Sequence, residues 1–125
     1  MAEMFDISRP IYAQLAERLE QRIAAGEYRP GQRLAPVREM AAEAGVNPNT
    51  MQRAMAELER RGLVKTERTA GRFVTEDEAC IAAVKQNSAE KKVDTFVQEM
   101  KRLGFTRRQL AEMILKKEEE EWKNC

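Results

Sequence analysis

Residues 46–58 read V-N-P-N-T-M-Q-R-A-M-A-E-L, and this stretch decides the fold. Asn47 is a residue type favoured at helix N-caps, and Pro48 follows at the first helical position, where proline is preferred. Apolar side chains then recur at the spacing of one helix face: Met51, Ala54, Met55 and Leu58. We therefore expect a helix that begins at Pro48 and ends before Gly62.

A second helix is predicted immediately before this one. It begins near Pro36 and is ended by Gly45, and its inner face carries Val37, Met40, Ala41 and Ala44. Two helices separated by three or four residues that include glycine are typical of a helix-turn-helix.

The chain upstream predicts one more helix and a very short strand. The helix begins around Arg9–Pro10 with Ser8 as its N-cap, and Gly26 ends it. Its apolar face is formed by Tyr12, Leu15, Ala16, Leu19 and Ile23. The turn at residues 28–31 leads into residues 32–34, which are expected to form the strand.

Downstream of Gly62 the pattern changes from helical to β-prone. Residues 63–67 and 72–75 are short runs of this kind, and residues 68–71 form the loop between them. A hairpin directly after a helix-turn-helix is a wing. The fold class predicted is mainly α with a small β-hairpin: a winged helix-turn-helix in residues 1–75, followed by a short helical dimerisation region in residues 76–125.

Residues 76–125 predict two amphipathic helices separated by Gly104, and Thr106 with Gln109 forms a capping box at the start of the second. Their apolar stripe is too long for the small winged domain to cover, so we expect a homodimer with twofold symmetry. A helical hairpin folded onto the winged domain is the alternative. The expected interface residues are Ile81, Val84, Val93, Phe96, Val97, Met100, Leu103, Leu110, Met113 and Ile114.

Composition excludes several function classes. The 125 residues include no histidine and two cysteines, Cys80 and Cys125, so the usual zinc sites and the commonest general base are missing. We therefore expect no metal, no cofactor and no enzymatic activity. No apolar run approaches the roughly 20 residues needed to span a bilayer, and the N-terminus lacks a secretory signal, so a soluble cytoplasmic protein is expected.

Several segments resemble the GntR family of bacterial transcription regulators. They are residues 10–15 (P-I-Y-A-Q-L), 31–34 (G-Q-R-L), 37–41 (V-R-E-M-A), 46–54 and 58–63. The resemblance covers roughly residues 8–75, and the short two-helix tail is similar to that of the YtrA-type subfamily. This resemblance implies a homodimer, a palindromic operator and frequent control of a nearby ABC-transporter operon.

The chain departs from the family pattern in two places. The family usually has Leu-Pro-Ser where this chain has residues 34–36 (L-A-P), so we expect Ala35 to leave the second helix without a side-chain cap, partly offset by Pro36 at the first helical position. The wing usually carries Arg-Gly-x-Gly-Thr, but residues 68–72 read R-T-A-G-R. The lost glycine and the added Arg72 favour a side-chain contact with the minor groove over close backbone approach.

In a winged helix, the N-terminal part of the third helix enters the major groove. Asn and Gln match adenine, Arg matches guanine, and Thr contacts a base or a phosphate. The expected DNA-contacting residues are Arg38, Asn47, Pro48, Asn49, Thr50, Gln52, Arg53, Lys65, Arg68, Thr69, Gly71 and Arg72.

Each of these residues also has a purely structural interpretation. Asn47 is an N-cap in either case, Arg38 is placed to pair with Glu39 or Glu43, and the wing residues suit turn chemistry. The formal net charge of +1 favours a winged protein-interaction module without specific DNA binding, because a basic surface is then not needed. The intact 47–53 segment favours a sequence-specific regulator of double-stranded DNA, more consistent with a repressor than an activator, with any small-molecule effector unassigned.

Overall fold

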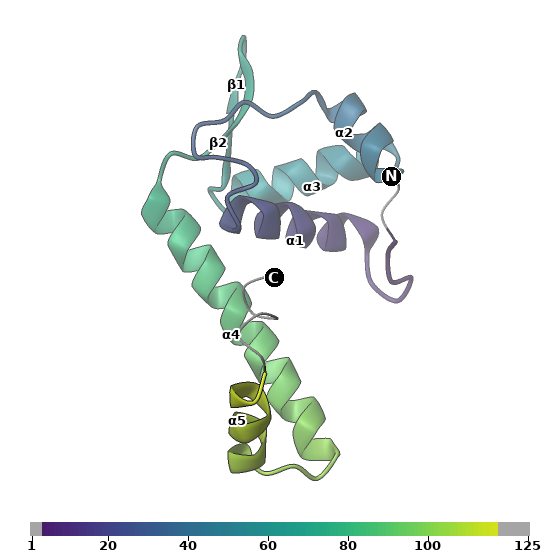
Figure 1. The fold of residues 1–125 in the computed structure, drawn as a ribbon. Helices are drawn as coiled ribbons and strands as arrows, with labels where there is room; N and C mark the ends of the chain where they lie inside the picture. Colours follow the sequence, from purple (N-terminus) through teal and green to yellow (C-terminus); the bar gives the residue numbers. More distant parts are fainter. Residues whose placement is uncertain (1–3, 118–125) are drawn as a thin grey trace. The chain divides into compact units, whose positions relative to one another are not determined.

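The structure is a computed structural model that describes residues 4–117 (Figure 1). Cys125 lies outside the described residues. The elements follow one another as α1 (Ile11–Ala24), α2 (Val37–Ala44), α3 (Pro48–Arg60), β1 (Val64–Glu67), β2 (Gly71–Val74), α4 (Glu78–Arg102) and α5 (Arg107–Leu115). The predicted order of three helices, a hairpin and two further helices is confirmed.

Helix α3 is the centre of the winged-helix core, because both α1 and α2 pack against it. Its predicted inner face is confirmed: Met51, Ala54, Met55 and Leu58 are at most 1% exposed. Burying a side chain of the size of Leu or Met contributes about 1.5–3 kcal/mol, so this face holds α3 firmly in place. The opposite face of α3 stays free for another role.

The ends of α2 and α3 follow from local sequence. Gly45 ends α2 in the left-handed conformation, with φ of 71°, as its lack of a Cβ allows. At the start of α3, the backbone N–H of Asn49 donates to the Asn47 side chain over 2.7 Å. Asn47 is therefore confirmed as the N-cap, with Pro48 at the first helical position.

Two predicted helix starts need correction. The N-cap of α1 is Pro10, and the Ser8 hydroxyl donates to Asp6 instead of capping the helix. The N-cap of α2 is Pro36, which makes no side-chain cap bond. The uncapped start of α2 was expected, but the residue in the cap position is Pro36 and not Ala35. Pro36 therefore occupies the N-cap position, and the first helical residue is Val37.

Gln14 binds the segment that precedes α1, and this role was not predicted. Its buried side-chain amide donates to the carbonyl oxygens of Asp6 and Arg9, over 2.5 and 3.0 Å. Its Oε1 atom accepts from the backbone N–H of Asp6 over 2.8 Å. A buried amide must satisfy its donors and acceptor, so Gln14 fixes the segment before α1 onto the helix.

Strands β1 and β2 form an antiparallel hairpin in which Val64 faces Val74 and Glu67 faces Gly71. The predicted short strand at residues 32–34 is present as one bridge between Arg33 and Phe73. The N–H of Leu34 donates to the carbonyl of Arg72, and the N–H of Val74 donates to Gln32. These bonds tie the wing to the segment before α2.

The chain forms two compact units, one ending at Asn87 and one beginning at Ser88. The first unit extends past the expected boundary at residue 75, because Cys80, Ile81 and Val84 of α4 pack against the winged-helix core. In the second unit, α5 starts with the predicted capping box: the N–H of Gln109 donates to Thr106 over 3.2 Å, and the N–H of Thr106 donates to Gln109 over 2.8 Å. Within residues 4–117, no helix is long and apolar enough to cross a membrane.

Candidate DNA interface

The N-terminal edge of α3 presents most of the expected base-reading side chains to solvent. Asn47, Pro48, Asn49, Gln52 and Arg53 are exposed, and Thr50 is half-buried. Met51 and Ala54 lie between them in sequence but face the core. The helix period therefore sorts the segment into a polar outer edge and an apolar inner face, as a recognition helix requires.

Arg53 has a partner that the sequence did not indicate. Its guanidinium carbon lies 4.0 Å from the centre of the Tyr12 ring of α1. Cation–π contacts of this kind contribute about 0.5–1 kcal/mol at exposed sites. Tyr12 is half-buried on α1. The contact holds the exposed Arg53 side chain at the outer edge of α3.

Arg38 lies in the first turn of α2 and is exposed. The ion pair with Glu39 or Glu43 that was its structural interpretation does not form within the described part of the chain. Its guanidinium is therefore available to an anion outside the protein.

The wing carries a second group of exposed residues: Lys65, Arg68 and Thr69. Gly71 has φ of 110°, a conformation that L side chains rarely adopt. A Cβ at this position would lie 3.2 Å from Nε of Arg33, whose side chain reaches the turn end of the hairpin, where Gly71 pairs with Glu67. Arg33 is exposed and basic, and its place beside the wing depends on the bridge to Phe73, so the linear sequence gave no signal for it.

The Arg72 side chain is directed toward α3, whereas the expected minor-groove contact would need it to point away from the protein. Its Nε atom lies 3.7 Å from Oε1 of Glu59, and its side chain is only 20% exposed. Its Nη1 group donates to Oε1 of Gln52 over 3.5 Å. Both Glu59 and Gln52 belong to α3, so Arg72 joins the wing to the recognition helix.

Charged contacts also fix the C-terminal end of α3. Glu57 accepts hydrogen bonds from Arg60 and Arg61, which together lower the pKa of Glu57 to about 2 against the opposing effect of burial. Arg61 also pairs with Glu20 of α1. Glu57 therefore stays ionised at neutral pH and helps to hold α3 against α1.

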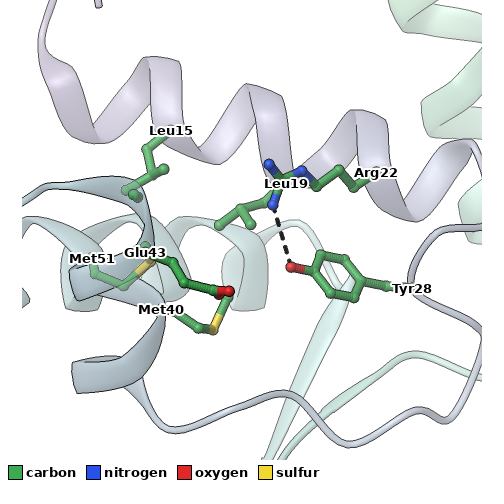
Figure 2. A pocket seen from close by; sticks show the side chains of 8 residues that line it. Leu15, Leu19, Arg22, Tyr28, Met40, Glu43 and Met51 are labelled. Carbon is green, nitrogen blue, oxygen red and sulfur yellow. Dashed lines mark hydrogen bonds between the residues drawn. The ribbon is translucent and has the colours of Figure 1, made fainter. Parts of the chain in front are cut away.

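A cavity of about 280 Å³ lies between α1, α2 and α3 (Figure 2). Its walls are Leu15, Leu19, Arg22, Tyr28, Met40, Glu43, Ala44 and Met51. Arg22 donates to the Tyr28 hydroxyl over 3.5 Å at its edge. Most of the lining belongs to the core of the winged helix, and the cavity does not include the exposed edge of α3.

Residues 11–74, which span all three helices and the wing, match the model of the gntR family of bacterial regulatory proteins. The chain belongs to this family. The match confirms the predicted winged helix and its DNA-binding role, and it identifies a transcription regulator and not an enzyme.

Individual relatives support the same conclusion. The helix-turn-helix transcriptional regulator YhcF of Bacillus subtilis (strain 168) is 40% identical over 114 residues, which is 91% of this chain and 94% of YhcF. The repressor YtrA of the same organism is 39% identical over 70 residues, 56% of this chain and 54% of YtrA. A GntR family regulator from Listeria monocytogenes has a TM-score of 0.83 at 37% identity, over 91% of this chain and all of that one.

Several similar structures contain DNA. The DNA-binding domain of AraR in complex with the operator ORR3 has a TM-score of 0.52 and 28% sequence identity, and the alignment covers 60% of this chain and 88% of that one. The fold of the winged unit is therefore also the fold of a domain that binds an operator.

Proposed function

We propose that this regulator binds a palindromic operator as a homodimer and represses transcription from it. The observation that carries the proposal is the exposed polar edge of α3 beside a basic wing, within a unit whose core is formed by the other face of the same helix. In the dimer, two such edges enter two major-groove half-sites.

The base contacts come from α3. Asn49 and Gln52 match the donor and acceptor pair of adenine, and Arg53 matches guanine. Asn47 and Thr50 lie at the start of the helix, where backbone N–H groups and short polar side chains bind phosphates. Pro48 occupies the first helical position, directly after Asn47.

The phosphate contacts come from α2 and the wing. Arg38, Lys65, Arg68 and Arg33 are exposed cations of α2, the wing and the segment before α2, and Lys65 lies 3.4 Å from Glu67. Thr69 and Gly71 are further proposed contacts of the wing with the minor groove or flanking phosphates. Such contacts position the protein without reading sequence, and they make binding steeply dependent on salt.

The dimer contacts come from apolar side chains of the second unit. Val93 is 57% exposed, Leu103 71% and Ile114 53%, and large apolar side chains exposed together mark an interaction surface. The other proposed contributors are Phe96, Val97, Met100 and Met113. Leu110 was expected in the same interface, but it is only 6% exposed in the single chain, so it supports α5 from within. Ile81 and Val84 were expected in the same interface, but they pack against the winged-helix core. We therefore do not assign them a central part in the dimer contact.

Repression follows from occupancy of a promoter, which needs no further contact with the transcription machinery. Two relatives of this chain, YtrA and NagR of Bacillus subtilis, are repressors by name. Because the target is chromosomal DNA, we place the protein in the bacterial cytoplasm.

Fluorescence anisotropy with a labelled duplex of the protein's own promoter tests sequence-selective binding. The wild type is expected to bind this duplex much more tightly than a scrambled one, with an affinity that falls steeply with salt. The double variant Asn49→Ala, Arg53→Ala loses this preference, whereas the exposed Lys85→Ala of α4 retains it. Equal affinity of the wild type for both duplexes contradicts the proposal and favours a winged protein-interaction module.

A further inference from the structure

Among the charged residues of the wing, Arg72 is the one whose side chain turns toward the protein. Its side chain is 20% exposed, and both its Nε atom and Oε1 of Glu59 are buried without a hydrogen-bond partner in the described part of the chain. The two atoms lie 3.7 Å apart, so the guanidinium and the carboxylate compensate one another's charge.

This pairing prevents Arg72 from acting as an ordinary DNA contact. If the guanidinium swung out to a phosphate, the buried oxygen of Glu59 would be left without its compensating charge, which is costly. Arg68, three positions before the start of β2, has no such constraint and is exposed to solvent with the rest of the wing loop. Arg68 is therefore available for a contact with DNA, whereas Arg72 binds residues of α3.

The contact with Gln52 has a consequence for base reading. Arg72 Nη1 donates to Oε1 of Gln52 over 3.5 Å. A guanidinium has only donors, so the amide of Gln52 must turn its oxygen to Arg72 and its NH₂ group away. The oxygen keeps a second lone pair for a base. The contact therefore favours one order of donor and acceptor along the edge of Gln52 before DNA arrives.

We propose that Arg72 is a positioning residue that sets the base preference of Gln52 and does not itself contact DNA. This inference rests on the proposed function, because it needs α3 in the major groove. Glu59 holds the guanidinium of Arg72 in place, and this guanidinium orients the side-chain amide of Gln52. A ready-oriented amide distinguishes adenine from other bases, whereas an amide free to rotate presents both orders and discriminates less.

The test is selection of preferred sequences from a randomised duplex pool by the full chain and its variants, with salt titrations on the selected duplex. Gln52→Ala identifies the base pair that Gln52 reads. Arg72→Ala and Arg72→Lys are then both expected to lose about fivefold or more of the preference at that base pair only. Lysine keeps the charge but lacks the planar fork of donors with which the guanidinium reaches Glu59 through Nε and Gln52 through Nη1.

The salt titration separates positioning from phosphate binding. Both Arg72 variants are expected to keep the wild-type slope of log affinity against log salt, whereas the control Arg68→Ala lowers the slope by about one, with no change in base preference. Preserved selectivity in Arg72→Ala overturns the inference, and so does a lowered slope in Arg72→Ala that Arg72→Lys restores. A Gln52→Ala variant that relaxes no base pair also overturns it. A wild type that selects no sequence instead contradicts the proposed function.

Discussion

Asn47 carries two roles at once, as the N-cap of α3 and as an expected DNA contact. Its side chain accepts the N–H of Asn49, and loss of such a cap costs about 1 kcal/mol. We expect Asn47→Ala to lower the free energy of unfolding by about this amount in urea denaturation, and to weaken operator binding as well. Asn47→Asp keeps the cap and places a negative charge beside phosphates. It should retain stability and still bind the operator poorly; equal loss of stability in both variants contradicts this assignment.

Residues whose role depends on near neighbours were predictable from the sequence. Asn47, Met51 and Met55 are placed by one helix period and one capping rule. Gln14 and Arg72 were not predictable in the same way. Gln14 is buried by a segment that folds back onto α1, and Arg72 meets Glu59 and Gln52 across a hairpin. The sequence does not distinguish a polar side chain that hydrogen-bonds to solvent from one that hydrogen-bonds to a residue far away in the chain.

At the scale of the element, the wing depends on Gly71. An L side chain at φ of 110° is strained by about 1–2 kcal/mol, and a Cβ there would also press on Arg33. Gly26→Ala is the matched control, because Gly26 has φ of 84° and open space around it.

We expect both variants to lose stability in thermal unfolding. Only Gly71→Ala is expected to weaken binding to the promoter duplex, since it alone displaces Arg33 near the wing turn. If Gly26→Ala weakens DNA binding as much as Gly71→Ala, the role assigned to Gly71 and Arg33 in DNA binding is wrong.

The elements themselves were largely predictable, because periodicity and glycine stops set their extent. The starts of α1 and α2 were not, since Pro10 and Pro36 occupy cap positions without making a cap bond. The boundary of the winged unit also moved, because Ile81 and Val84 belong to the winged-helix core. From sequence alone, an apolar residue of α4 is equally consistent with packing inside one chain and with packing in a dimer interface.

At the scale of the whole molecule, dimerisation is expected to depend on the exposed apolar stripe of α4. Phe96 is 38% exposed and lies on this stripe, whereas Thr95 lies about 100° around the helix from Phe96 and off the stripe. We expect Phe96→Glu to give monomers in analytical ultracentrifugation at micromolar concentration, and Thr95→Glu to remain dimeric. Wild-type protein that is monomeric under the same conditions contradicts the dimer.

The central claim is that two copies of α3 read two related half-sites, and hydroxyl-radical footprinting of the full chain on its own promoter tests it most directly. The account predicts two protected segments related by a dyad, with centres about 10–10.5 base pairs apart or a multiple of this spacing. A single protected segment without dyad symmetry, or uniform weak protection along the duplex, would contradict it.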